Sequence, residues 1–234
     1  MTARIDNLAF RRTTFILYEI VNDLGLQKAP WFNQLATLLM IVLVFWFRMF
    51  VHYVGQYFIL KAMDAPVSSL EIDWYRLHLS YDIWNVTMEM LVIAFGPLSN
   101  SVIFLFFGAV CYLSNRYIYC FPVLFCKFIA WYGLLNIMDF IFIVVVDAAF
   151  MKEDGDAWKL YSYYEKTEKS GEVGLFVTIL IQFGILIFNC YIFYNYIVFI
   201  HCDARIKDIY LRISGLGKGY YIPEDNEVSW NYLM

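Results

Sequence analysis

Four long runs of hydrophobic residues, separated by polar stretches, set the pattern of this chain. They cover residues 35–60, 89–113, 121–146 and 174–200. At about 1.5 Å of rise per residue, each run is long enough as a helix to cross a hydrocarbon layer of about 30 Å. We therefore predict an all-α, polytopic membrane protein with four transmembrane helices.

Amphipathic segments flank these runs and predict interfacial helices at both ends of the chain. Residues 7–25 mix apolar and charged positions in a way that is typical of a helix lying in the membrane interface. We expect three regions: an N-terminal interfacial segment (1–33), a transmembrane domain (34–201) and a C-terminal amphipathic tail (202–234). The end of the tail is apolar again and predicts a docking peptide for a partner, with the candidate residues Tyr221, Ile222, Trp230 and Tyr232.

The connection between the first two runs, residues 61–88, has no single predicted structure. Its alternation at Trp74, Arg76 and His78 is as compatible with a strand as with a surface helix. Both alternatives stay open at this point.

A proline interrupts the second run. Pro97 has no backbone N–H and clashes with the carbonyl four residues earlier, so a helix kink is predicted around Pro97 and Asn100. The hydroxyl and amide groups of Ser99, Asn100 and Ser101 are available to hydrogen-bond the freed backbone groups. The functional alternative is a re-entrant or unwound binding element.

Polar residues inside the apolar runs form the candidate site. Charged groups at the bilayer centre cost ~2.5–3.5 kcal/mol each on insertion scales and need partners. Counting the helical rise from the ends of the predicted spans places four residues at similar depths in the membrane, namely Arg48, His52, Asp139 and Gln182. The predicted intramembrane polar cluster is Arg48, His52, Asn136, Asp139 and Gln182.

The main interpretation of this cluster is structural. We expect Arg48 or His52 to pair with Asp139 and fasten the first and third helices, with Gln182 and Asn136 completing the hydrogen bonds. The alternatives are that the cluster lines an ion or proton path, or that it meets a polar group of a partner subunit.

Composition supports the membrane class. The chain is 62% hydrophobic and 16% charged, against about 45–50% and 25% in soluble proteins. Its net charge of −4 is small and no basic cluster occurs, so binding to nucleic acid is disfavoured. An even number of spans puts both termini on one side, and the distribution of Lys and Arg predicts that this is the cytoplasmic or matrix-like side. The compartment stays open between ciliary or plasma, endolysosomal and mitochondrial inner membranes.

Motifs for catalysis or metal binding are missing from the sequence. The five cysteines show no CxxC or Cys/His ligand spacing, and there is no HExxH, P-loop or nucleophile elbow. His52 and His201 fall at opposite ends of the membrane, which argues against a bis-histidine haem. We therefore expect no enzyme activity, no catalytic or metal site, and no cofactor other than structural lipids. No internal repeat is visible, which weighs against an inverted-repeat transporter.

Four stretches carry a family resemblance. They are Leu60-Lys61-Ala62-Met63 to Pro66-Val67, Gly96 to Asn100, Trp131-Tyr132-Gly133-Leu134 up to Asp139, and Ile222-Pro223-Glu224-Asp225 up to Val228-Ser229. They resemble the C-terminal multi-span membrane region of large eukaryotic proteins related to the orofacial cleft candidate protein. The resemblance implies a short, free-standing version of a membrane anchor region and no established activity. A weaker likeness, at Gly108-Ala109 to Tyr112, Asn115-Arg116 and Pro122, is to lysosomal four-spanning proteins, whose proline-rich tail this chain lacks.

The function predicted from these observations is that of a non-enzymatic integral membrane subunit. It anchors or stabilises a larger membrane protein assembly, with other membrane proteins and lipids as its partners. The 21% aromatic content and the amphipathic flanks favour this interpretation. One alternative is a small channel or transporter with a polar intramembrane path, and another is an accessory subunit of a mitochondrial inner-membrane respiratory or ATP synthase complex.

Overall fold

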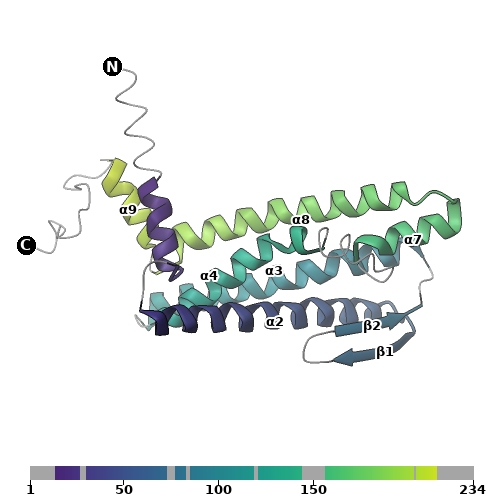
Figure 1. Ribbon diagram of the computed structural model, residues 1–234, viewed down its shortest axis with the longest axis horizontal. Coiled ribbons are helices and arrows are strands. Elements are labelled where there is room, and N and C mark those ends of the chain that lie inside the picture. The colour runs from purple at the N-terminus through teal and green to yellow at the C-terminus, as the bar shows by residue number, and fades with distance from the viewer. Residues whose placement is uncertain are drawn as a thin grey trace, which may run out of the picture. The chain divides into compact units, whose positions relative to one another are not determined.

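The computed structural model describes residues 14–26, 30–72, 77–82, 85–118, 121–143, 156–202 and 204–214, and these are mostly helical. A helix at residues 14–23 comes first. The further elements, labelled in Figure 1, are α2 (Trp31–Ala62), β1 (Val67–Ile72), β2 (Leu77–Tyr81), α3 (Val86–Tyr117), α4 (Val123–Ile137), α5 (Asp139–Ile141), α7 (Asp156–Glu168), α8 (Glu172–Phe199) and α9 (Arg205–Ser214).

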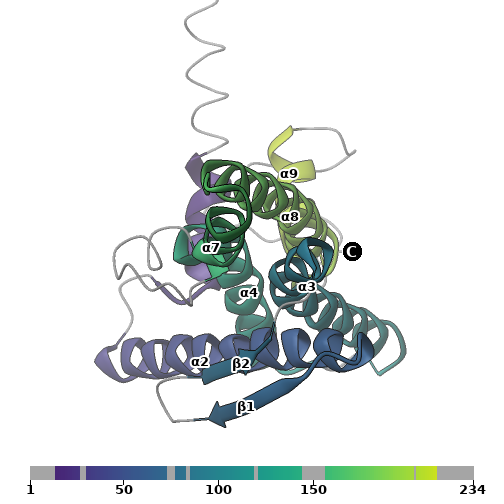
Figure 2. The same ribbon diagram turned by 90° about the vertical axis from the view of Figure 1, so that its right-hand side faces the viewer.

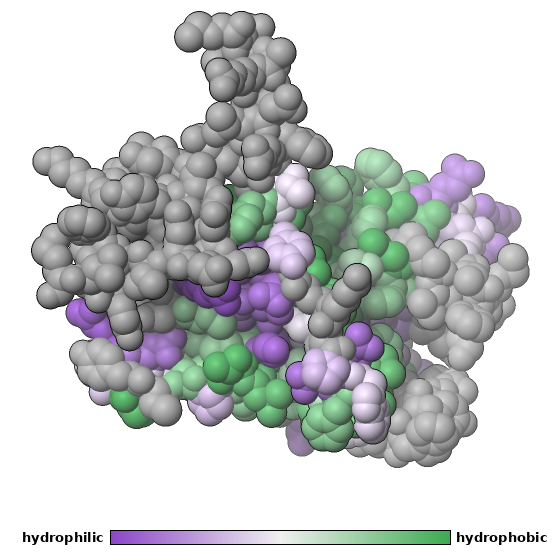
Figure 3. Space-filling model, turned by 60° about the vertical axis from the view of Figure 1, so that its left-hand side comes forward, coloured by the Kyte–Doolittle hydropathy of each residue, from purple (hydrophilic) through white to green (hydrophobic). Residues whose placement is uncertain are grey.

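Three helices, α2, α3 and α8, are long and apolar enough to cross a membrane. They have 32, 32 and 28 residues, beyond the roughly 20 that a hydrocarbon core requires. Large apolar side chains such as Leu38 and Phe183 are exposed on them. Figure 3 shows hydrophobic side chains, in green, at the surface of the described residues. The first, second and fourth runs therefore form helices that are long and apolar enough to cross a membrane.

The third run forms a shorter helix than predicted. α4 has 15 residues, or about 22 Å of helix, and it stops at a turn before α5 begins. The turn residue Met138 keeps helical dihedral angles, with φ −72° and ψ −7°. The end of the predicted run, after residue 143, lies outside the described residues.

The chain divides into two compact units. The first unit comprises residues 1–41, 108–130 and 194–234, and the second comprises residues 42–107 and 131–193. α2, α3, α4 and α8 each contribute residues to both units, so the division crosses the three regions expected from the sequence.

An antiparallel hairpin of β1 and β2 follows α2 in the second unit. Figures 1 and 2 show it beside the C-terminal half of α2. Leu79 packs there with Leu60 of α2 and with Met88 and Val92 of α3 in one buried cluster. The strand alternative is therefore the correct one for residues 67–72 and 77–81, whereas Trp74 and Arg76 lie outside the described residues.

A charged connection in the second unit contains a helix that we did not predict. α7 spans Asp156–Glu168 and turns directly into α8, and Figures 1 and 2 show the two helices side by side. Gly174 permits this close approach, because an added Cβ would lie 2.3 Å from the carbonyl oxygen of Leu160. α7 thereby brings charged side chains of the connection to the polar residues of α2.

Candidate functional site

A row of polar side chains on one face of α2 begins the site, within the second unit. Arg48, His52 and Gln56 follow one another at intervals of four residues, which aligns them along the helix. Their exposed fractions are 5%, 7% and 0%. Such a row in an apolar helix requires partners from neighbouring elements.

Asp139 is the partner of Arg48. The guanidinium Nη2 donates to the Asp139 carboxylate, and both side chains are buried. The guanidinium also lies over two aromatic rings, 5.7 Å from the Phe45 centroid and 5.2 Å from the Phe142 centroid. Ion pairing and cation–π contacts together compensate part of the cost of burying this charge.

The second carboxylate oxygen of Asp139 is held by α3. The side-chain amide of Asn100 donates to Asp139 Oδ2 over 3.4 Å, and the Tyr132 hydroxyl donates to Asn100 Oδ1 over 3.0 Å. The three residues are buried and come from α3, α4 and α5. Both oxygens of Asp139 are therefore used in bonds between helices.

His52 pairs with an acid that the sequence analysis did not single out. Asp156, the first residue of α7, places its Oδ2 2.8 Å from His52 Nε2 and 2.9 Å from Gln56 Nε2. The second Asp156 oxygen lies 2.7 Å from Lys159 Nζ. Of the two predicted partners of Asp139, Arg48 therefore forms the pair, and His52 bonds the Asp156 carboxylate of α7 instead.

Electrostatics at Asp156 and Lys159 favour the charged forms. Burial alone would raise the pKa of Asp156, but the charges and hydrogen bonds of Lys159 and His52 outweigh it and hold that pKa well below its usual range. Burial likewise opposes the charge on Lys159, and Asp156 outweighs it to raise the pKa of the amine. The two groups form a nearly buried ion pair, with side-chain exposures of 11% and 12%.

The hairpin joins the same network through Tyr81. Its hydroxyl donates to the two oxygens of Glu89 over 3.2 and 3.3 Å, and Lys159 Nζ lies 5.3 Å from the Tyr81 ring centroid. Burial raises the pKa of Tyr81, so this hydroxyl keeps its proton. β2, α3 and α7 are connected at this point.

Gln182 of α8 is not bonded to the charged residues. Its side-chain amide donates to the carbonyl of Ile93 over 3.3 Å. Pro97, four residues after Ile93, cannot supply the usual backbone donor. α3 continues unbroken from Val86 to Tyr117, which does not fit the re-entrant or unwound alternative.

Asn136 contributes its backbone rather than its side chain. Asn189 of α8 donates to the Asn136 carbonyl over 3.3 Å, just before the turn at Met138, and accepts from the Ser101 hydroxyl over 2.6 Å. The side-chain atoms of Asn136 are buried and have no hydrogen-bond partner among the described residues. We expected Asn136 and Gln182 to complete the hydrogen bonds of the charged cluster. Among the described residues, Gln182 instead bonds the Ile93 carbonyl, and Asn136 contributes only its own backbone carbonyl.

The predicted residues thus fall into several bonded groups rather than one cluster. Asn100, predicted only as a kink residue, belongs with Arg48 and Asp139. Asp156 and Lys159 were missed, because their position in a charged connection gave no sign of burial. The predicted docking residues Tyr221, Ile222, Trp230 and Tyr232 lie outside the described residues.

Comparison of the chain with protein-family models, curated proteins and solved structures returns no match. The geometry of the site is therefore the basis for a functional hypothesis. Its buried polar side chains form hydrogen bonds that involve seven elements, α2, β2, α3, α4, α5, α7 and α8, an arrangement that can hold helices in a fixed relationship.

Proposed function

We propose that this protein is a non-enzymatic integral membrane subunit that anchors or stabilises a larger membrane protein assembly. Other membrane proteins and lipids are its partners, and structural lipids are its only cofactors apart from the ion considered in the next subsection. In this proposal four helices span the membrane, and the third predicted run, which contains α4 and α5, is one of them. The helix at 14–23 and α9 lie in the interface, and both termini are on the cytoplasmic or matrix-like side.

The observation that carries the proposal is how the buried polar groups of the long helices are used. Arg48 bonds Asp139, Gln182 bonds the Ile93 carbonyl, and Asn189 bonds the Asn136 carbonyl. In an apolar surrounding such bonds fasten helices and set their register. Side chains engaged in this way support a structural role for the cluster.

α8 supplies the face that we assign to partner proteins. Its buried side carries Thr178, Gln182, Ile185 and Asn189 at spacings of three and four residues. The opposite side exposes a second stripe at similar spacing, defined by Phe176, Leu180, Phe183, Ile187 and Tyr191.

Aromatic content distinguishes this α8 stripe from one exposed stretch of α2, which we call the α2 face. The α2 face consists of Leu35, Leu38, Leu39, Val42 and Leu43, which are aliphatic and suit lipid chains. Outside this stretch α2 also exposes aromatic residues, namely Trp31, Phe32, Phe45, Trp46 and Phe58. Aromatic side chains are enriched at protein interfaces, because they offer a large contact area with few rotatable bonds. We therefore assign the α8 stripe to a partner and the α2 face to lipid.

Native electrophoresis of the tagged full chain, extracted from its own membrane in mild detergent, tests the proposal. We expect a discrete species larger than the monomer, containing the same proteins in constant ratio. Phe183→Ala combined with Ile187→Ala should release the monomer, whereas the matched pair Leu38→Ala with Leu39→Ala should not. A monodisperse, partner-free wild-type monomer would contradict the proposal.

A second candidate is a small channel or transporter, favoured by one observation. Arg48, His52 and Gln56 form a continuous buried row that meets the carboxylates of Asp139 and Asp156, and rows of ionisable groups occur in proton paths. Reconstituted liposomes separate the two candidates. A flux that Asp139→Asn abolishes without loss of folding would establish conduction, and no flux of cations, anions or protons would count against it.

The family resemblance and the mitochondrial accessory role stay proposals as well. Both imply a membrane subunit without chemistry of its own, which agrees with the leading hypothesis. Imaging of the tagged protein distinguishes ciliary, endolysosomal and mitochondrial membranes and is the observation that separates them.

A further inference from the structure

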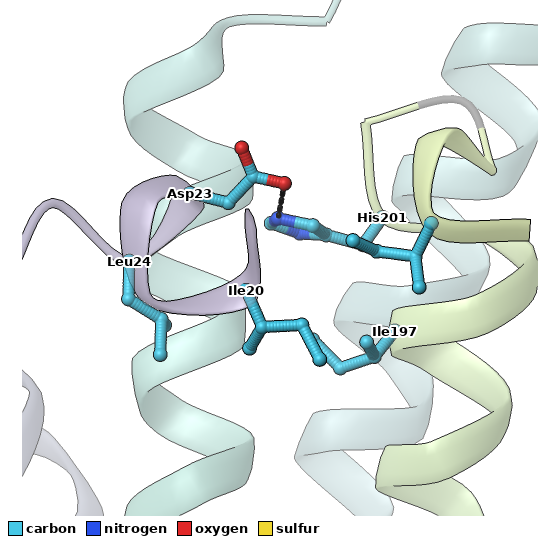
Figure 4. Close-up of a pocket in the computed structure, with 6 residues that line it drawn as sticks. Ile20, Asp23, Leu24, Ile197 and His201 are labelled. Carbon is cyan, nitrogen blue, oxygen red and sulfur yellow. Dashed lines mark ion pairs between the residues drawn. The ribbon is translucent and has the colours of Figure 1, made fainter. Parts of the chain in front are cut away.

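Three potential metal ligands from distant parts of the sequence meet in the first unit. Asp23 ends the helix at 14–23, and His201 and Cys202 lie in the turn between α8 and α9. One carboxylate oxygen, one imidazole nitrogen and the thiol sulfur lie within 4.8 Å of one another. Figure 4 shows the Asp23 carboxylate directed at the His201 ring.

The spacing of these atoms is close to that of a tetrahedral zinc site. With Zn–N and Zn–S bonds of about 2.0 and 2.3 Å, tetrahedral angles place neighbouring N and S ligands about 3.5 Å apart. His201 Nε2 and Cys202 Sγ are separated by 3.5 Å. Asp23 Oδ2 lies 3.9 Å from the same nitrogen, so a movement of well under 1 Å would bring it to the about 3.3 Å expected for N and O ligands.

Asp23 is oriented as a ligand would be. Arg205 donates to its Oδ1 over 2.6 Å, which fixes the carboxylate and leaves Oδ2 facing His201. Oδ2 is buried and accepts no hydrogen bond from any described residue, and Asp23 as a whole is only 8% exposed. A buried carboxylate oxygen without a donor is uncommon, and a bound metal ion would supply its missing partner.

The tautomer of His201 is also suited to metal binding. The Tyr196 hydroxyl donates to the Cys126 carbonyl over 3.2 Å, so its oxygen can accept the Nδ1–H of His201, 3.4 Å away. The lone pair is then on Nε2, the nitrogen that faces Asp23 and Cys202. Metal-binding histidines are commonly held in this way by a hydrogen bond at the other ring nitrogen.

Cys126 lies next to this group but is not part of it. Its thiol interacts with the thiols of Cys202 and Cys111, whereas among the described residues only Asp23, His201 and Cys202 have ligand atoms that all lie within 4.8 Å of one another. The pocket beside Asp23 and His201 is otherwise lined by aliphatic residues, among them Ile20, Leu24 and Ile197 (Figure 4). Three donors of mixed S, N and O type leave one position of a tetrahedral zinc site for water.

We propose that Asp23, His201 and Cys202 bind one divalent transition-metal ion of the zinc class, with water in the fourth position. Binding releases the Cys202 thiol proton to solvent and ties the helix at 14–23 to the turn after α8. This departs from the expectation of no metal site, which rested on sequence spacing, because Asp23 lies far along the chain from His201 and Cys202.

Metal analysis of the full-length protein, purified in detergent from cells grown with zinc, tests the proposal. We expect one zinc per chain in the wild type, retained in Cys190→Ser and lost in Cys202→Ser. Cys190 is an exposed thiol on α8, so this control removes a cysteine without touching the site. Equal zinc in the two variants means that the ion is adventitious and overturns the proposal.

A variant could lose zinc because it fails to fold. Cobalt titration of the metal-depleted wild type avoids this ambiguity. Co²⁺ alone should produce a thiolate charge-transfer band and tetrahedral ligand-field bands at one equivalent, and Zn²⁺ should remove both. Asp23→Asn should weaken binding at least tenfold. Absence of these bands in folded, reduced protein, or a Cys126–Cys202 disulfide in protein isolated from its native membrane, overturns the proposal.

Discussion

Gln182 donates its side-chain amide to the carbonyl of Ile93, the acceptor that Pro97 leaves without a backbone donor. The bond joins α8 to α3 at the point where α3 lacks one of its own hydrogen bonds. A proline within a membrane-crossing helix is thereby accommodated by a neighbouring helix.

Replacing Gln182 should expose this dependence. Gln182→Leu leaves the Ile93 carbonyl buried and unpaired, which we expect to lower the free energy of unfolding by about 1–3 kcal/mol. In a Pro97→Ala background the restored backbone N–H serves the same carbonyl, so Gln182→Leu should cost much less there. Unfolding in mixed detergent micelles measures both, and an equal cost in the two backgrounds would refute the assignment.

The hydrogen bond between Gln182 and the Ile93 carbonyl shows which parts of the fold can be predicted from the sequence and which cannot. Hydrophobic run length predicts α2, α3 and α8, and the proline rule identifies Ile93 as the freed acceptor. The sequence analysis expected Ser99, Asn100 and Ser101 as donors, because they are local. It could not identify Gln182, since the rotation of α8 about its axis depends on tertiary packing.

The charged residues were likewise predicted only in part. Helical rise gave Arg48 and Asp139 similar depths, and the structure pairs them. The same reasoning could not find Asp156, because α7 lies in a polar connection whose burial arises only from the turn into α8. The sequence spacing also could not predict that Asp23 and His201 lie close together.

The packing of α8 against α7 should tolerate no side chain at Gly174. An added Cβ meets the Leu160 backbone carbonyl, which cannot rotate away, so we expect Gly174→Ala to destabilise by about 1–3 kcal/mol. Gly184 lies on the same helix with nothing within 4 Å of an added Cβ. Gly184→Ala should therefore be neutral or stabilise by up to about 1 kcal/mol. Comparable losses in both variants would argue against this packing.

The Asp156 ion pair should make stability depend on acid pH. Because the pKa of Asp156 is held below its unfolded value of about 4, its contribution is present above that pH and is lost as the pH falls towards the folded pKa. The difference in unfolding free energy between wild type and Asp156→Asn should shrink below about pH 4. The exposed variant Glu168→Gln is the control and should show little change. A difference that stays constant through this range would contradict the pairing.

Arg48 and Asp139 provide the most direct test of the claim that the polar residues fasten the helices. Each of Arg48→Met and Asp139→Leu leaves one charge buried without its partner, for which we expect a loss of about 3–5 kcal/mol. The double variant removes both charges and should cost less than the sum of the two losses by more than about 2 kcal/mol. The measurement is the coupling free energy from unfolding of the four proteins in mixed micelles. Additive losses within about 0.5 kcal/mol would contradict the account.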